Sequence, residues 1–177
     1  MPVRRFATIA GLAAALAVLP VHAQNQGHGH APGTASDGHL KAQACADEFE
    51  AVVRDGRGFG MAFAADQQGY PGPMHVLELK DRLGLDAAQE ARVRALVHAM
   101  FSESRPKGAR LLDAEARLRA LFAAGKAGEA AVRAAVAEVE RARADIRLVH
   151  LLAHLETREL LTESQRRAYQ EARWPGR

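Results

Sequence analysis

Two long stretches of the chain carry apolar residues spaced three and four positions apart, a pattern typical of amphipathic helices that bury one face. The first stretch begins after Asp86, and the second runs from Glu129 to about Leu160, after a turn at Gly125 to Gly128. Such a short connection predicts an antiparallel hairpin. The two stripes consist of Val93, Leu96, Val97, Met100, Phe101, Leu111, Ala114, Leu118, Leu121 and Phe122, and of Val132, Val136, Val139, Ile146 and Val149.

The rest of the chain also favours helices. Ala, Leu, Arg and Glu dominate from Ala46 onward, without hairpin signals in strand contexts, so the predicted fold class is all-α. A short helix is expected from Pro73 to about Arg82, with Gly84 ending it. Inside the first long stripe, Pro106 predicts a kink or short break near Ser104 to Gly108.

Two capping boxes mark where helices begin. Asp86 precedes Gln89 by three residues, and Thr162 stands in the same relation to Gln165. In each box the first side chain accepts a backbone N–H at the third helical position, and the Gln side chain reaches back. We expect Thr162→Ala to cost about 1 kcal/mol of stability and Gln165→Ala to cost less.

The first residues predict export. Residues 1–23 combine Arg4 and Arg5, a short apolar stretch and a small-x-small site at Val21-His22-Ala23, as in a signal peptide cleaved after Ala23. Residues 24–44 are rich in Gly, Gln and His and nearly free of apolar side chains, which predicts a disordered leader. A single all-helical domain is then expected over residues 45–174, in the periplasm.

The net charge and the cysteine content limit the partners and the disulfides that this chain can have. The net charge is +3, of which Arg4 and Arg5 in the signal supply two, so a nucleic-acid partner is not indicated. Cys45 is the single cysteine, so an internal disulfide is excluded. We expect Cys45 to be buried on a short helix from Cys45 to Arg54, and an intermolecular disulfide is the alternative.

His150 and His154 lie one turn apart in the run "LVHLLAH" and fall on the inward seam of the second long helix. Leu148, Leu151, Leu152 and Leu155 lie on the opposite side, so this stretch is apolar all round, which predicts a homodimer.

Two buried imidazoles on one face favour a shared metal ion, although each ring would also be satisfied by a carbonyl or carboxylate partner. The Glu of the zincin motif is missing between His150 and His154, which argues against hydrolysis at a metal. No nucleophile–base pair or acid pair is visible either, so an enzyme is not expected.

The motifs "LGLDAAQ" and "LLTESQ", which flank the predicted hairpin, resemble the repeated Leu-Thr-x-x-Gln signature of the Spy and CpxP family of periplasmic stress proteins. The zinc-resistance protein ZraP and the metal sensor CnrX are similar to that family. The resemblance covers roughly residues 55–173 and implies a four-helix hooked fold; Asp86 replaces the usual Thr and keeps the cap.

The sensor branch is closest at "MHVLEL" and "LVHLLAH", where its nickel- or cobalt-binding histidines correspond to His75 and His150. The resemblance places Leu79 or a neighbour where the sensor has a second histidine, His154 where it has a methionine, and His98 near the position of its carboxylate. The implied metal ligands are therefore His75, His98, His150 and His154, an imidazole set that suits Zn, Cu, Ni or Co.

Met74, beside His75, would favour copper if it turned inward. The function predicted from these features is a non-enzymatic periplasmic envelope-stress protein that binds a transition metal and senses or buffers it, with a possible membrane-bound regulatory partner. The alternative is a Spy-like, ATP-independent chaperone that holds unfolded client proteins.

Overall fold

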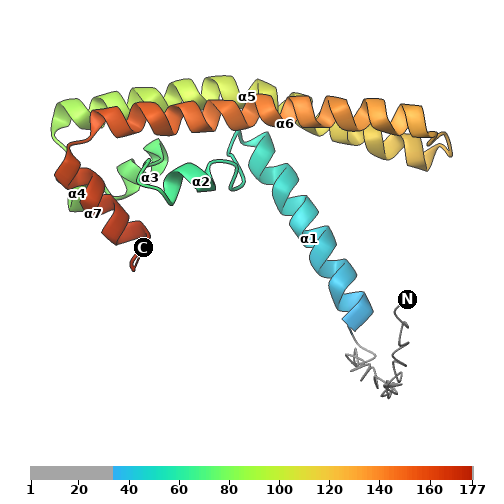
Figure 1. Cartoon of the computed structure of the whole chain (residues 1–177), viewed down its shortest axis with the longest axis horizontal. Helices are drawn as coiled ribbons and strands as arrows, with labels where there is room; N and C mark the ends of the chain where they lie inside the picture. Colours follow the sequence, from blue (N-terminus) through green and yellow to red (C-terminus); the bar gives the residue numbers. More distant parts are fainter. Residues whose placement is uncertain (1–33, 177) are drawn as a thin grey trace, which may run out of the picture.

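A computed structural model describes residues 34–176, and the predicted signal peptide, together with the leader as far as residue 33, lies outside them. The described residues form helices and turns without a strand, which confirms the all-α prediction (Figure 1). The helices are α1 (Thr34–Arg54), α2 (Phe63–Asp66), α3 (Pro73–Glu78), α4 (Lys80–Leu83), α5 (Ala87–Ala123), α6 (Glu129–Leu160) and α7 (Glu163–Arg173). Within this part of the chain, no helix is long and apolar enough to cross a membrane.

The long helices α5 and α6 lie side by side as the predicted antiparallel hairpin (Figure 1). The turn between them contains Gly125, whose positive φ of 64° is a conformation that glycine adopts without strain. One buried cluster joins the hairpin to the end of α1 and consists of Val53, Leu111, Ala114, Val139 and Ile146. The apolar stripes read from the sequence are thus the faces that pack together along most of the hairpin, whereas Phe122 and Val136, near the α5–α6 turn, are exposed.

Helix α5 runs through Pro106 without interruption, so the predicted break is wrong. Pro106 lies on the exposed side of α5, where water can hydrate the Ser102 carbonyl that lacks a proline N–H partner. The opposite side is held by packing: the Ser104 hydroxyl donates to the Gly56 carbonyl at 2.6 Å, and a Cβ at Gly108 would overlap the Val53 carbonyl. This close approach of α1 stabilises a continuous helix.

Helix α1 begins at Thr34, well before the predicted start at Cys45, and it leans away from the hairpin (Figure 1). Residues 34–44, predicted as part of the disordered leader, are therefore helical. With so few apolar residues, this segment cannot contribute to a hydrophobic core, but it can still form a helix that is exposed to solvent. Cys45 is exposed rather than buried, because α1 reaches the core only near its C-terminal end, at Phe49 and Val53.

The short helices α3, α4 and α7 form a hook at the end of the hairpin away from the α5–α6 turn (Figure 1). The predicted short helix is present as two pieces, α3 and α4, and Gly84 ends the second in a left-handed conformation with φ of 61°. A second buried cluster holds the hook on α5 and consists of Val76, Leu83, Val93, Leu161 and Tyr169.

Both predicted capping boxes are present, and they meet in space. The Gln89 amide donates to Gln165 Oε1 and the Gln165 amide donates to Gln89 Oε1, each at 2.9 Å. Gln89 Nε2 also donates to the Leu160 carbonyl at 3.0 Å. The starts of α5 and α7 are therefore joined by a reciprocal amide pair, which fixes the angle of the hook.

Candidate metal centre

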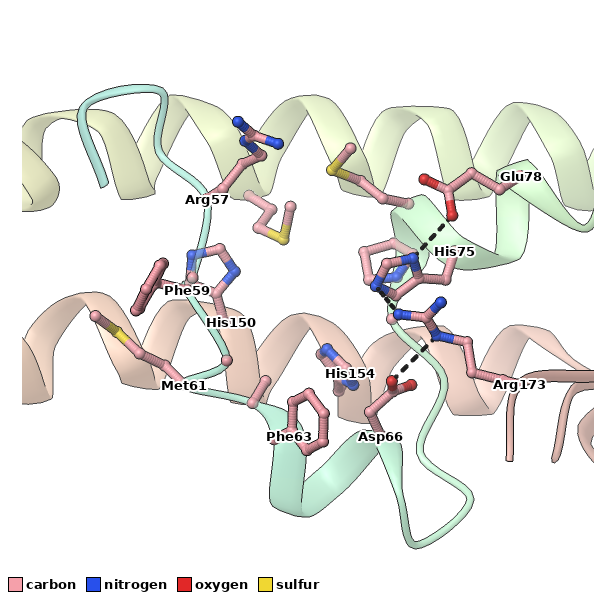
Figure 2. A pocket seen from close by; sticks show the side chains of 17 residues that line it. Arg57, Phe59, Met61, Phe63, Asp66, His75, Glu78, His150, His154 and Arg173 are labelled. Atoms are coloured by element: carbon pink, nitrogen blue, oxygen red, sulfur yellow. Dashed lines mark hydrogen bonds and ion pairs between the residues drawn. The ribbon is translucent and has the colours of Figure 1, made fainter. Parts of the chain in front are cut away.

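A pocket with a volume of about 320 Å³ lies where the hook meets the hairpin (Figure 2). The loop before α2, helix α3, helix α6 and the end of α7 each supply part of its wall, and α5 contributes Met100. Its polar, sulfur-containing and aromatic side chains are Arg57, Phe59, Met61, Phe63, Asp66, Met74, His75, Glu78, Met100, His150, His154 and Arg173.

His150 is 6% exposed, and its Nε2 atom is buried without a hydrogen-bond partner. Burial, and then the charge of His154, lower the pKa of His150 to about 4, while the Gly56 carbonyl opposes the shift. The ring packs on backbone, because a Cβ at Gly58 would lie 3.0 Å from it. His150 is therefore a neutral imidazole near pH 7, with a lone pair inside the protein.

His154 is 8% exposed and lies one turn farther along α6, toward Asp66 and Arg173 (Figure 2). Its Nδ1 is 2.7 Å from the Tyr70 carbonyl, which can only accept, so Nδ1 carries the proton and Nε2 keeps its lone pair. Burial lowers the pKa of His154, partly offset by the Tyr70 carbonyl and the Asp66 charge. A carbonyl on one ring nitrogen is the usual way in which proteins orient a metal-binding imidazole.

His75 lies in the same pocket, but both of its ring nitrogens are engaged (Figure 2). Arg173 Nη2 donates to His75 Nε2 at 2.9 Å, so the proton of the neutral ring is on Nδ1, which is 2.9 Å from Glu78. Arg173 also contacts Asp66 at 3.3 Å. A metal ion could use His75 Nε2 only after the Arg173 guanidinium had moved.

Asp66 contacts both Arg173 and the buried Tyr169 of the hook. It accepts a hydrogen bond from the Tyr169 hydroxyl, and burial, followed by the bond to Asp66, raises the pKa of Tyr169. The Asp66 carboxylate is therefore occupied by Tyr169 and Arg173. Sequence reasoning missed Asp66 and Arg173, because they are 107 residues apart and no local pattern connects them.

His98 is separated from the other three histidines. It is exposed and borders a different pocket, formed by Leu77, Arg94, Phe101 and their neighbours. The inward face of α5 at this level is marked by the buried Met100, and a residue two positions earlier on a helix points to the other side. Of the four histidines expected to lie together, only His75, His150 and His154 line the same pocket.

The donors fit a metal ion only in part. Among residues 34–176, no group of three or more His, Cys, Asp or Glu side chains is arranged to hold a metal. His150 and His154 nevertheless offer two neutral imidazoles from adjacent turns, and the unpartnered Nε2 of His150 is the kind of buried atom that a metal ion would satisfy. These two residues fit a metal, and further donors must come from other side chains of the pocket.

The described residues thus form an all-α protein, a hooked helical hairpin with two buried histidines where the hook meets α6. The chain belongs to the heavy-metal resistance family, which its sequence matches over residues 58–168. This match spans the hairpin and every histidine of the pocket. No curated protein and no solved structure gives a significant match.

Proposed function

We propose that this chain is a non-enzymatic periplasmic protein that binds a transition metal at His150 and His154 and senses or buffers that metal. The observation that carries the proposal is the buried Nε2 atom of His150, which lacks a hydrogen-bond partner. Leaving a buried polar atom unsatisfied costs about 1–3 kcal/mol, and a coordinated metal ion would recover that energy. Membership of the heavy-metal resistance family supports the same assignment.

His75 supplies a route from binding to sensing. Its Nε2 accepts from Arg173, which belongs to α7, while His154 lies in the same pocket. A metal ion that recruits His75 would displace the guanidinium and release the contact between Arg173 and Asp66. The position of α7 would then depend on metal, as a signal to a membrane-bound regulatory partner requires.

The test is a calorimetric titration of protein starting at Gln24 with Zn(II), Cu(II), Ni(II) and Co(II). We expect saturable binding of at least one ion, with strong weakening by His150→Ala and by His154→Ala. His98→Ala and His39→Ala are matched controls, because both histidines are exposed. Binding that survives the combined His150→Ala and His154→Ala replacement would contradict the proposal.

We further propose that two copies associate through the outer face of α6. Leu148, Leu152 and Leu155 are 55%, 46% and 49% exposed and lie three or four residues apart. Such a row of large apolar side chains on one helix face is typical of an interface between chains. A second copy of α6 would bury it and would place two pockets in one assembly.

The same leucine row supports the second candidate function, a chaperone of the Spy kind that holds unfolded clients in envelope stress. Phe63 and Phe122 are also exposed, at 51% and 60%, and add apolar surface. Suppression of aggregation of a denatured model protein tests this function. Replacing Leu148 and Leu152 by Gln should abolish it, whereas His150→Ala should leave it unchanged.

A further inference from the structure

We infer that the pocket selects a soft monovalent ion, Cu(I) or Ag(I), and completes its coordination with methionine sulfur. The inference rests on the proposed metal binding at His150 and His154 and specifies the class of metal. The observation behind it is that Met61, Met74 and Met100 all line this pocket, and these are the methionines of the described chain. They come from the loop before α2, from α3 and from α5.

Met74 and Met100 line the same pocket as the two histidines and pack on the adjacent face of α6. Met100 is 6% exposed and clusters with Val149 and Ala153, and Met74 packs against the same cluster. Val149 and Ala153 directly precede the two histidines in the sequence, so the methionines contact α6 at the two turns that carry the imidazoles. A methionine side chain has three rotatable bonds beyond its Cα, so its sulfur can move to a nearby ion without any change in backbone.

The remaining candidate donors of the pocket are already occupied. Asp66 accepts from Tyr169 and contacts Arg173, while Glu78 is bonded to His75. His75 Nε2 accepts from Arg173 and becomes a ligand only when the guanidinium moves. In the part of the chain described, no third His, Cys, Asp or Glu completes a metal-holding group. A site with two imidazoles therefore gains its further ligands from thioethers, which are soft donors that favour Cu(I) over Zn(II), Ni(II) or Co(II).

The cost of burying charge also favours a monovalent ion over a divalent one. Imidazole and thioether ligands are neutral, so the ion keeps its full charge. The two arginines of the pocket are balanced by Asp66 and Glu78, and these carboxylates are already bonded to other side chains. The desolvation energy of an ion grows with the square of its charge, so a divalent ion is penalised roughly fourfold more than a monovalent ion of similar size. Phe59 and Phe63 line the pocket as well, and aromatic faces attract a cation without neutralising it.

Silver is the more convenient probe, because Ag(I) is diamagnetic and stable in air. Cys45 is an exposed free thiol that would itself capture Ag(I) or Cu(I), so every measurement uses the Cys45→Ser background. The protein is labelled with 13C at its methionine methyl groups and titrated with Ag(I). Met74→Leu and Met100→Leu assign the two resonances and keep the volume and apolar character of the side chains.

We expect the Met74 and Met100 methyl resonances to shift until about one equivalent of Ag(I) has been added. The double Leu variant should lower the affinity for Ag(I), and for Cu(I) measured against a colorimetric chelator, by about tenfold or more. Its affinity for Zn(II) or Ni(II) should change by less than about threefold, because the histidines remain. Circular dichroism of the double variant verifies that it folds, and the wild-type shifts test the inference without any variant.

The outcomes separate this inference from the function on which it depends. Unmoved Met74 and Met100 resonances at saturating Ag(I) would overturn it and leave these methionines as core filling. Tight binding of a divalent ion, with Ag(I) bound equally well by the double Leu variant, would overturn it but keep the proposed metal function. Absence of saturable binding of every ion tested would refute both.

Discussion

The amide pair between Gln89 and Gln165 gives a quantitative test of how the hook is held. Gln165 Oε1 accepts from the Thr162 backbone N–H at 2.9 Å and from Gln89, and Gln165 Nε2 donates back to Gln89, both at 2.9 Å. Gln165→Ala removes these three hydrogen bonds at a site that is 9% exposed. At about 1 kcal/mol for each bond, the free energy of unfolding should fall by about 3 kcal/mol.

Thr162→Ala should cost less, about 1 kcal/mol, because the Thr162 hydroxyl accepts the Gln165 N–H at 3.2 Å and otherwise shares only an exposed bond with the Ser164 hydroxyl. The order expected from the sequence, with Gln165→Ala the milder change, is therefore reversed. Within a local capping box the Gln165 side chain makes a single bond, which it accepts from the Thr162 N–H, whereas in the folded protein it also pairs with Gln89.

A double-mutant cycle isolates that contact. Gln89→Ala, Gln165→Ala and the double variant are unfolded in urea at one protein concentration and followed by circular dichroism. The two bonds between the amides should appear as a coupling energy of about 1–2 kcal/mol. Gln43→Ala is the matched control. The Gln43 amide donates to Asp47 on the exposed part of α1, so its removal should leave the free energy of unfolding unchanged. A coupling energy of zero, or a smaller loss for Gln165→Ala than for Thr162→Ala, would refute the reasoning.

Three further predictions follow from the pocket and from α6. Burial lowers the pKa of His150 from 6.5 to about 4, so on acidification the histidine is protonated in the unfolded chain before it is protonated in the folded protein. The free energy of unfolding, measured by urea titration, should therefore be full above pH 6.5 and fall by up to about 3 kcal/mol toward pH 4. An equally steep fall in the His150→Leu variant would show that His150 is not the cause. Gly72→Ala should weaken metal binding several-fold in calorimetry, because its Cβ would lie 3.0 Å from His154 Nε2, whereas Gly38→Ala meets nothing and should bind normally. Leu148→Gln combined with Leu152→Gln should halve the mass measured by light scattering, and a wild-type protein that is already monomeric at micromolar concentration would show that no dimer forms.

The hairpin and both capping boxes could be predicted from the sequence, because each depends on residues close together in the chain. The periodic stripe places Val139 and Ile146 on the buried face, and the three-residue spacing places Gln89 beside Asp86. The burial of His150 and His154 followed from the same periodicity. The apolar periodicity and the capping-box spacing are local patterns, and the folded protein keeps the structures that they predict.

Features that depend on tertiary contacts could not be predicted. Pro106 breaks a helix in isolation, but the Ser104 bond to Gly56 and the fit of Gly108 against Val53 hold α5 together. Likewise, the contact of Arg173 with His75 joins residues that are 98 positions apart.

His98 shows the limit of reasoning by resemblance. Alignment with the sensor branch brought it within one residue of a ligand position, and on a helix one residue changes the direction of a side chain by about 100°. Met100, two positions later, is the residue that lines the pocket.

The splayed position of α1 has a consequence for the distribution of stability within the molecule. At about 1.5 Å per residue, its 21 residues extend for about 30 Å, yet its buried contacts with the hairpin are made near Phe49 and Val53. The amides of its early turns are protected only by hydrogen bonds within the helix, so they should exchange with deuterium through local fraying, while those around Val53 require the hairpin to open. Helix α1 would thus loosen from its N-terminal turns toward Val53, while the core of the hairpin beside the pocket stays folded.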